Sequence, residues 1–230
     1  MRSLHLLRVA QLFVFALATP LMVSAQTVVP VAPFGSVELH DGVEVILRHG
    51  PTQSVTLLKG SLDYTSIRIA DAVLIIDTCK NRCPRGYKLE IEIVTPNIVG
   101  ILVSDGGTLQ SLGDFPRQPE IGVTVRQGGT IDIRSMGGDN VTASVEQGGR
   151  IFTMPQTTLF ASVVYGGEIN YWGEARVESS VRDGGAVTRR TADEADKPLS
   201  DFGPNLSVPA PVQPVPPIQP LRKPKRISGF

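Results

Sequence analysis

Five Gly-Gly pairs recur in the second half of the chain and limit what it can fold into more than any other feature. Each pair lies in the frame V-x-x-G-G-x-φ, where φ is apolar, and the steps between pairs are 22, 20, 18 and 18 residues. A repeat of about this length is typical of a solenoid, whose units bury their apolar sides by stacking on each other. Glycine reaches positive φ without a Cβ penalty, so each pair predicts a corner between strands. The predicted corner glycines are Gly106, Gly107, Gly128, Gly129, Gly148, Gly149, Gly166, Gly167, Gly184 and Gly185.

The positions around each pair alternate between apolar and polar residues. Counted from the first glycine, positions −7, −5, −3 and +3 are apolar or small in nearly every repeat, as in Ile121, Val123, Val125 and Ile131. Alternation with period two indicates strands with one buried face. We therefore predict an all-β fold, a single-stranded parallel β-helix with right-handed connections, in which residues of the same frame stack. An antiparallel sandwich is the alternative, but its hairpins need not repeat one frame.

Residues 34–98 carry strand signals but lack the Gly-Gly frame. Alternating segments such as 43–47 and 88–94 are separated by turn residues. The terminal repeats of a solenoid are usually atypical because they cover an open edge. We expect this part to form irregular N-terminal β coils, or a capping sheet, of one domain that spans residues 34–190.

The two ends of the chain differ in composition from this domain. Residues 1–25 combine Arg2 and Arg8 with an apolar run and a small-residue cleavage pattern, which is typical of a signal peptide. A membrane anchor is the alternative, although the apolar run is short for a full span. Residues 26–33 are expected to be a short linker, and residues 191–230 a Pro-rich disordered tail. The chain is thus expected to be exported to the periplasm, cell envelope or extracellular space, with no transmembrane segment after signal removal.

Cys79 and Cys83 are the only cysteines, and they bracket a short polar turn. In an exported protein such a pair is expected to form a disulfide. A redox role is the alternative, but the C-x3-C spacing differs from the usual C-x-x-C arrangement.

The charges are distributed unevenly along the chain. The full chain has 22 basic and 22 acidic residues, whereas residues 26–196 hold 15 basic and 21 acidic ones. An acidic body argues against nucleic-acid binding, which needs a basic surface. The repeat frame also places Arg126 beside Glu146, and Arg150 beside Glu168.

The outward polar residues do not predict catalysis. The acids fall in different columns of the repeat, so the close carboxylate pair that glycoside hydrolysis requires is missing. We expect no catalytic residues, no metal site and no cofactor, and we expect His40 and His49 to be surface or turn residues. A polysaccharide-active β-helix enzyme is the alternative, in which Asp132 or Glu168 would be the first residues to test.

Three aromatic residues occupy nominally outward positions on neighbouring coils. Phe152, Tyr165 and Trp172 lie close in the repeat to polar residues such as Asn170. Exposed aromatic rings beside polar groups can stack on a sugar ring or anchor a protein partner. Phe152, Tyr165, Asn170 and Trp172 are therefore the candidate ligand contacts. The alternative is that they pack against the segment after the repeats or cover the edge of a coil.

The chain also resembles a known bacterial family, the putative auto-transporter adhesin head GIN domain. The resemblance covers roughly residues 34–188. It depends on F-G-S-V-E-L at 34–39, D-G-V-E-V at 41–45 and I-E-I-V-T-P at 91–96, in that order before the Gly-Gly coils. It implies a β-solenoid in an exported protein and a role in adhesion, and it supplies no catalytic motif. From the length after the coils we expect no C-terminal membrane barrel of the kind that a full auto-transporter carries.

The combined expectation is an exported, non-enzymatic binding or structural module of the bacterial cell envelope. Its expected partner is an envelope glycan or an envelope protein. A scaffold that docks a protein through its Pro-rich tail, which ends in basic residues, is a further alternative.

Overall fold

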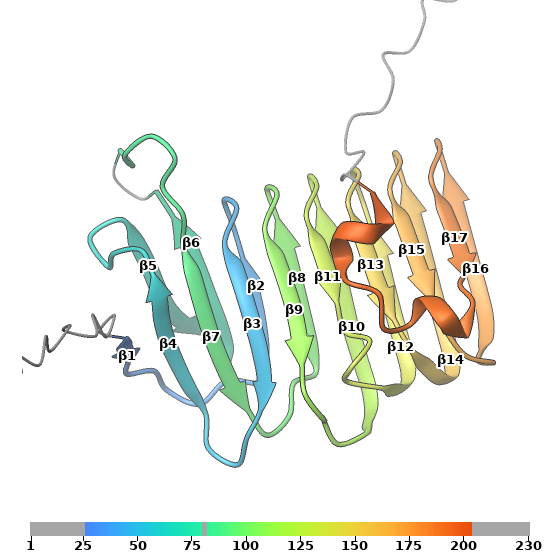
Figure 1. The fold of residues 1–230 in the computed structure, drawn as a ribbon, viewed down its shortest axis with the longest axis horizontal. Helices are drawn as coiled ribbons and strands as arrows, with labels where there is room; N and C mark the ends of the chain where they lie inside the picture. The colour runs from blue at the N-terminus through green and yellow to red at the C-terminus, as the bar shows by residue number, and fades with distance from the viewer. Residues whose placement is uncertain (1–25, 80–81, 204–230) are drawn as a thin grey trace, which may run out of the picture.

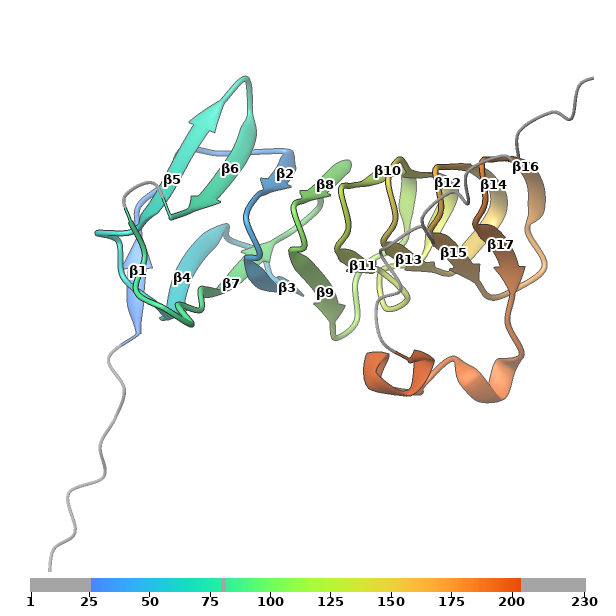
Figure 2. The ribbon, with the colours of Figure 1, turned by 90° about the horizontal axis from the view of Figure 1, so that it is seen from above.

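The computed structural model describes residues 26–79 and 82–203, and these form an all-β fold of two mixed sheets that face each other (Figures 1 and 2). The predicted all-β class is confirmed. In spatial order the nine-stranded sheet contains β1 (Thr27–Val29), β4 (Ser54–Lys59), β7 (Glu90–Thr95), β3 (Glu44–His49), β9 (Thr108–Leu112), β11 (Thr130–Asp132), β13 (Arg150–Thr153), β15 (Glu168–Tyr171) and β17 (Ala186–Arg189). The eight-stranded sheet contains β16 (Arg176–Arg182), β14 (Pro155–Val164), β12 (Gly138–Val145), β10 (Gln118–Arg126), β8 (Gly100–Ser104), β2 (Ser36–Leu39), β6 (Val73–Thr78) and β5 (Thr65–Ala70).

Each Gly-Gly repeat contributes one strand to each sheet, and we call such a pair of strands a coil. From β8 to β17 every pairing between neighbouring coils is parallel. Residues at the same repeat position are direct partners across these ladders. One column, for example, consists of Val103, Val125, Val145, Val163 and Val181.

The core lies between the two sheets. Val103, Val125, Val145 and Val163 are each fully buried, and so is Ile151 on the facing sheet. Burying an aliphatic side chain of this size contributes roughly 1.5–3 kcal/mol, so each added coil extends the core by several such contributions. The alternating apolar pattern thus sets which face of each strand points inward.

The glycine pairs form the corners between the two sheets, as the repeat predicts. Nine of the ten predicted corner glycines have positive φ, and Gly107 is the exception. The second glycine of a pair is also tightly enclosed. An ideal Cβ at Gly167 would lie 2.5 Å from Val145 Cγ1 and 2.9 Å from the carbonyl oxygen of Gly149. These corners therefore need glycine both for backbone conformation and for space.

The N-terminal part differs from the coils because it contains antiparallel strands. β4 pairs antiparallel with β1 and β7, and β5 pairs antiparallel with β6. Strands β2 and β3 join this part to the parallel ladders through β8 and β9. The segment 26–33, expected to be a linker, therefore includes β1, an edge strand of the nine-stranded sheet.

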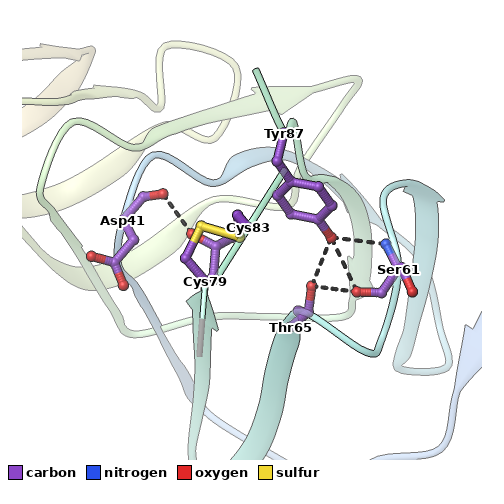
Figure 3. The surroundings of a disulfide bond; sticks show 7 residues. Asp41, Ser61, Thr65, Cys79, Cys83 and Tyr87 are labelled. Atoms are coloured by element: carbon purple, nitrogen blue, oxygen red, sulfur yellow. Dashed lines mark hydrogen bonds between the residues drawn. A yellow bond between two sulfur atoms is a disulfide. The ribbon is translucent and has the colours of Figure 1, made fainter. Parts of the chain in front are cut away.

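The predicted disulfide between Cys79 and Cys83 is confirmed (Figure 3). It follows β6, and the chain then returns through Tyr87 to β7. The Tyr87 hydroxyl accepts a hydrogen bond from the Ser61 amide at 2.8 Å and contacts Thr65 Oγ1 at 3.2 Å. The disulfide and Tyr87 together hold the irregular loops at this end of the stack.

The expectation of a disordered tail from residue 191 is wrong for residues 191–203, which fold against the repeats. This segment contains two short 3-10 helices, η1 (Ala192–Glu194) and η2 (Leu199–Phe202). Both lie on the outer side of the nine-stranded sheet (Figure 2). Segments 1–25 and 204–230, which carry the predicted signal peptide and the rest of the predicted tail, lie outside the described residues. Within the described residues, no helix is long and apolar enough to cross a membrane.

Candidate functional site

Residues 191–203, which we call the strap, cover the outer face of the nine-stranded sheet over its C-terminal coils. Trp172 Nε1 donates a hydrogen bond to the Thr191 carbonyl oxygen at 2.9 Å, where the strap begins. At the other end, the Phe202 ring lies 5.0 Å from the Phe152 ring and 5.9 Å from the Trp172 ring, measured between centroids. The strap thus closes over the aromatic residues of β13 and the turn after β15.

Arg134 lies at the centre of this aromatic cluster. Its guanidinium carbon is 5.3–5.6 Å from the centroids of Phe152, Trp172 and Phe202. The same guanidinium contacts both carboxylate oxygens of Asp132, at 2.9 and 2.7 Å. It also donates to the carbonyl oxygens of Ala195 and Lys197 at 2.8 and 2.9 Å. One side chain therefore combines cation–π contacts, a buried ion pair and two bonds to the strap backbone.

Arg150 holds the far end of the strap. Its Nη1 donates to the carbonyl oxygens of Phe202 and Gly203 at 3.1 and 2.8 Å. Burial lowers the pKa of the Arg150 guanidinium, while the in-register partner Glu168 opposes this effect. Arg190 bonds the neighbouring Asn170 Oδ1 through its Nε at 2.8 Å. The basic side chains on this face thus bind the chain's own backbone and side chains.

The structure corrects the expected exposed aromatic surface. Phe152, Asn170 and Trp172 are 0%, 1% and 2% exposed, because the strap covers them. Of the four candidate ligand contacts only Tyr165 is exposed, at 55%. A hollow of about 610 Å³ lies beside η1 next to Trp172. Phe152 and Trp172 instead pack against the segment after the repeats, which was the alternative interpretation.

The acids suggested for an enzyme are also accounted for by local contacts. Asp132 is 3% exposed and fully engaged with Arg134. Glu168 lies beside Arg150, as the repeat frame predicts. Arg126 Nε lies 3.2 Å from Glu146 Oε1, which confirms the other predicted pair. Among the described residues, no group of three or more His, Cys, Asp or Glu side chains could hold a metal ion.

The outer face of the eight-stranded sheet carries no such cover among the described residues. From β10 to β16 it presents mainly small hydroxyl side chains and one large aromatic ring, and we call this surface the open face. Its central residues are Thr124, Thr142, Ser144, Phe160, Ser162 and Ser180. Phe160 is 44% exposed in the middle of these hydroxyl groups.

Two shallow hollows lie on the open face and at its edge. One, of about 440 Å³, is centred on Phe160 and is bounded by Thr142, Ser162 and Glu178. The other, of about 340 Å³, lies at the corner and is lined by polar side chains that include Gln127 and Gln147. Tyr165 occupies the same repeat position as these two glutamines on the next coil, immediately before the Gly-Gly pair. The exposed aromatic and amide groups are thus gathered along one side of the stack.

His40 lies at the edge of the corner hollow, where it bonds two strands together. Its Nδ1 is 2.7 Å from Ser104 Oγ, and its Nε2 is 2.8 Å from Glu38 Oε1. This Ser-His-carboxylate order resembles that of a catalytic triad. The Ser104 hydroxyl, however, donates to Asp105 Oδ2 at 2.7 Å, and Ser104 is only 5% exposed. The nearly buried Ser104 hydroxyl is thus shared between His40 and Asp105, and the group links β2 to β8. The expectation that His40 is a simple surface residue missed this link.

Sequence reasoning missed the three arginines that hold the strap. Arg134, Arg150 and Arg190 occupy outward positions of three different coils, Arg190 with its guanidinium 5.8 Å from the Phe202 ring centroid, and outward arginines are usually solvated. The available signal was Phe202, the only aromatic residue within 191–203. A single large apolar side chain in a polar segment suggests an anchor to the adjacent fold.

This architecture and its open face define an all-β, two-sheet protein whose exposed chemistry suits binding. A comparison with protein-family models identifies the family. Residues 33–153, just over half of the chain, match the family model described as putative auto-transporter adhesin, head GIN domain, and the chain belongs to this family. No curated protein matches the chain in sequence.

Several solved structures are similar to this chain at low identity. A putative adhesin from Bacteroides fragilis shows 14% identity and a TM-score of 0.47, covering 72% of this chain and 96% of its own. A putative adhesin from Parabacteroides merdae shows 13% identity and a TM-score of 0.37, covering 73% and 96%. A putative cell adhesion protein from Clostridium sporogenes shows 11% identity and a TM-score of 0.33, covering 73% and 99%.

Proposed function

We propose that this protein is an exported, non-enzymatic binding module of adhesin type that binds a glycan of the cell envelope or cell surface on its open face. The observation that carries this proposal is the contrast between the two outer faces. On the C-terminal coils the strap occupies the outer face of the nine-stranded sheet, and the outer face of the eight-stranded sheet leaves Phe160 exposed among hydroxyl groups. The family to which the chain belongs supports a role in adhesion.

The chemistry of the open face suits a polyhydroxylated ligand. An exposed aromatic ring offers an apolar surface for the C–H side of a sugar ring. The surrounding Ser and Thr hydroxyls can both donate and accept hydrogen bonds. Gln127, Gln147 and Tyr165 extend these groups along the corner, so a ligand longer than one sugar would meet polar contacts on several coils.

The type and handedness of the solenoid are part of the same proposal. The coils would form a right-handed parallel β-helix, which the in-register parallel ladders support. Such a stack is a rigid platform, because each strand in its interior is bonded on both sides. Export would follow from the signal-peptide pattern in residues 1–25. The catalytic alternative has less support, since Asp132 is bound to Arg134 and the Ser104 hydroxyl donates to Asp105.

The test is binding of residues 26–230 to immobilised envelope polysaccharides and peptidoglycan fragments, measured by biolayer interferometry. Phe160→Ser should weaken binding about tenfold, because an aromatic contact contributes about 1–1.5 kcal/mol beyond its buried area. Leu62→Ser is the matched control, since Leu62 is similarly exposed, at 46%, but lies between β4 and β5. Equal affinities for the two variants, or no binding by the parent protein, would refute the proposed site.

A further inference from the structure

Both sheets end in an unpaired strand at the C-terminal end of the stack. β16 is the last strand of the eight-stranded sheet, and β17 is the last strand of the nine-stranded sheet (Figure 1). Each therefore presents one row of backbone N–H and C=O groups with no partner strand in the described residues. We infer that two copies of this chain join end to end through β16 and β17, so that each sheet continues from one copy into the other.

The last coil exposes part of the core at this end. Its column valine, Val181, is 44% exposed, whereas Val103, Val125, Val145 and Val163 in the same column are fully buried. The strap does not cover this end, because it leaves β17 along the outer side of the nine-stranded sheet (Figure 2). A repeat stack needs a terminal unit that covers its last apolar layer, and this coil is instead an ordinary repeat.

The opposite end is protected in ways that the C-terminal end is not. β1 has only three residues, and β5 is held antiparallel to β6 and pairs Arg68 with Asp77 across that hairpin. Short edge strands and charged edge residues are common means of preventing edge-to-edge association. β16 is longer, at seven residues, and its charged side chains, Arg176, Glu178 and Arg182, are of both signs, so they can pair with those of a second copy instead of repelling it.

The remaining chain is a poor partner for this edge. Residues 204–230 contain eight prolines among 27 residues, and their longest Pro-free run is the terminal K-R-I-S-G-F. Proline lacks the N–H group that a ladder requires. The seven residues of β16 therefore find their best-matched partner in β16 of a second copy.

The charges of β16 favour one antiparallel register. A two-fold axis perpendicular to the sheets places β16 opposite β16 and β17 opposite β17 of the second copy. If the axis passes through Ser180, Glu178 faces Arg182 of the other copy twice. An axis through Ser179 would instead set Arg176 opposite Arg182, and like charges directly opposite are destabilising. The Ser180 register therefore defines the proposed dimer.

This register makes a site-specific test possible. The two native cysteines form a disulfide, so Ser180→Cys introduces a single free thiol. At the two-fold axis the two thiols would face each other, and mild oxidation should convert most of the protein to a covalent dimer. Ser162→Cys is the control, because Ser162 is the partner of Ser180 one coil further in and lies on an interior strand. Equal cross-linking of the two variants would overturn the proposal.

A charge exchange tests the same register without a covalent bond. Glu178→Arg should weaken the dimer about tenfold in sedimentation equilibrium, because two opposite-charge pairs become like-charge pairs. Adding Arg182→Glu to this variant should restore the dimer. A parent protein that stays monomeric at every concentration would refute the inference. The dimer tests do not use a glycan, so their failure is distinguishable from failure of the proposed binding function.

Discussion

The two glycines of one corner differ in the space that they leave for an added side chain, and the effect of this difference on stability can be measured. Gly166 and Gly167 are adjacent and both have positive φ, at 83° and 103°. An added Cβ at Gly166 would meet no atom within 4 Å, whereas one at Gly167 would lie 2.5 Å from Val145 Cγ1. Alanine at Gly166 therefore carries only a backbone cost, and alanine at Gly167 adds a steric clash.

The expected magnitudes follow from these two terms. An L-residue at positive φ costs about 1–2 kcal/mol, which is the whole expectation for Gly166→Ala. Forcing a methyl group into a packed interior adds about 1–3 kcal/mol, so Gly167→Ala should cost about 2–5 kcal/mol in total. For a domain of this size 1 kcal/mol lowers the melting temperature by about 2–4 °C. The Gly167 variant should therefore melt several degrees below the Gly166 variant.

The assay is thermal and urea unfolding followed by circular dichroism. A double-mutant cycle with Val145→Ala identifies the clash, because this change removes Val145 Cγ1. The loss caused by Gly167→Ala should be smaller in the Val145→Ala background, with a coupling of about 1–2 kcal/mol. Equal melting temperatures for the two glycine variants, or purely additive effects in the cycle, would contradict the steric argument.

The strap supplies three further predictions, each read by the emission of Trp172, the only tryptophan. Phe202→Ala should release the strap and shift Trp172 emission to the red, whereas Phe160→Ala on the open face should leave it unchanged. Arg134→Lys should destabilise the strap by about 1–3 kcal/mol, because an ammonium cannot bind Asp132 in bidentate fashion and still reach two carbonyl oxygens; an unchanged unfolding midpoint would count against this. A hydrogen bond to the Thr191 side chain lowers the pKa of Asp193 below its ordinary value of 3.8. Ionised Asp193 therefore stabilises the strap above about pH 3.8, and this contribution is lost as the pH falls through the lowered pKa. In an acid titration followed by Trp172 emission, Asp193→Asn should lack the change that protonation of Asp193 causes.

The regular part of the fold could be predicted because one constraint repeats. Each coil must place an apolar side chain under that of its neighbour, so Val125 and Val145 reveal their pairing by position alone. The corner glycines add a second signal of the same period. The N-terminal strands β4 and β5 could not be predicted in this way, because antiparallel pairing there depends on contacts between segments that share no repeat.

The candidate site was harder to predict because outward positions have no such constraint. Phe152 on β13 and Trp172 just after β15 lie on the outer side of the sheet, as the alternation predicts, but the strap then buries them. That outcome depends on Phe202, which lies 30 residues beyond Trp172 in a segment whose composition suggests disorder. Local periodicity therefore shows which face a side chain occupies, but not whether another segment covers that face.

The same repeat thus produces two faces with different uses. On the nine-stranded sheet, outward Arg134 and Arg150 bind strap carbonyl groups, and this side is closed by the chain itself. On the eight-stranded sheet, small outward residues leave a smooth surface around Phe160. In the proposed dimer this sheet continues into its copy, so two open faces would form one longer surface. A polymeric glycan could then contact both, and the second contact would be intramolecular and strengthened by effective concentration. Arg182→Glu breaks the same charge pairs but lies outside the hollow around Phe160, so it should weaken binding to long glycans more than to short ones, and equal losses for both would separate dimerisation from adhesion.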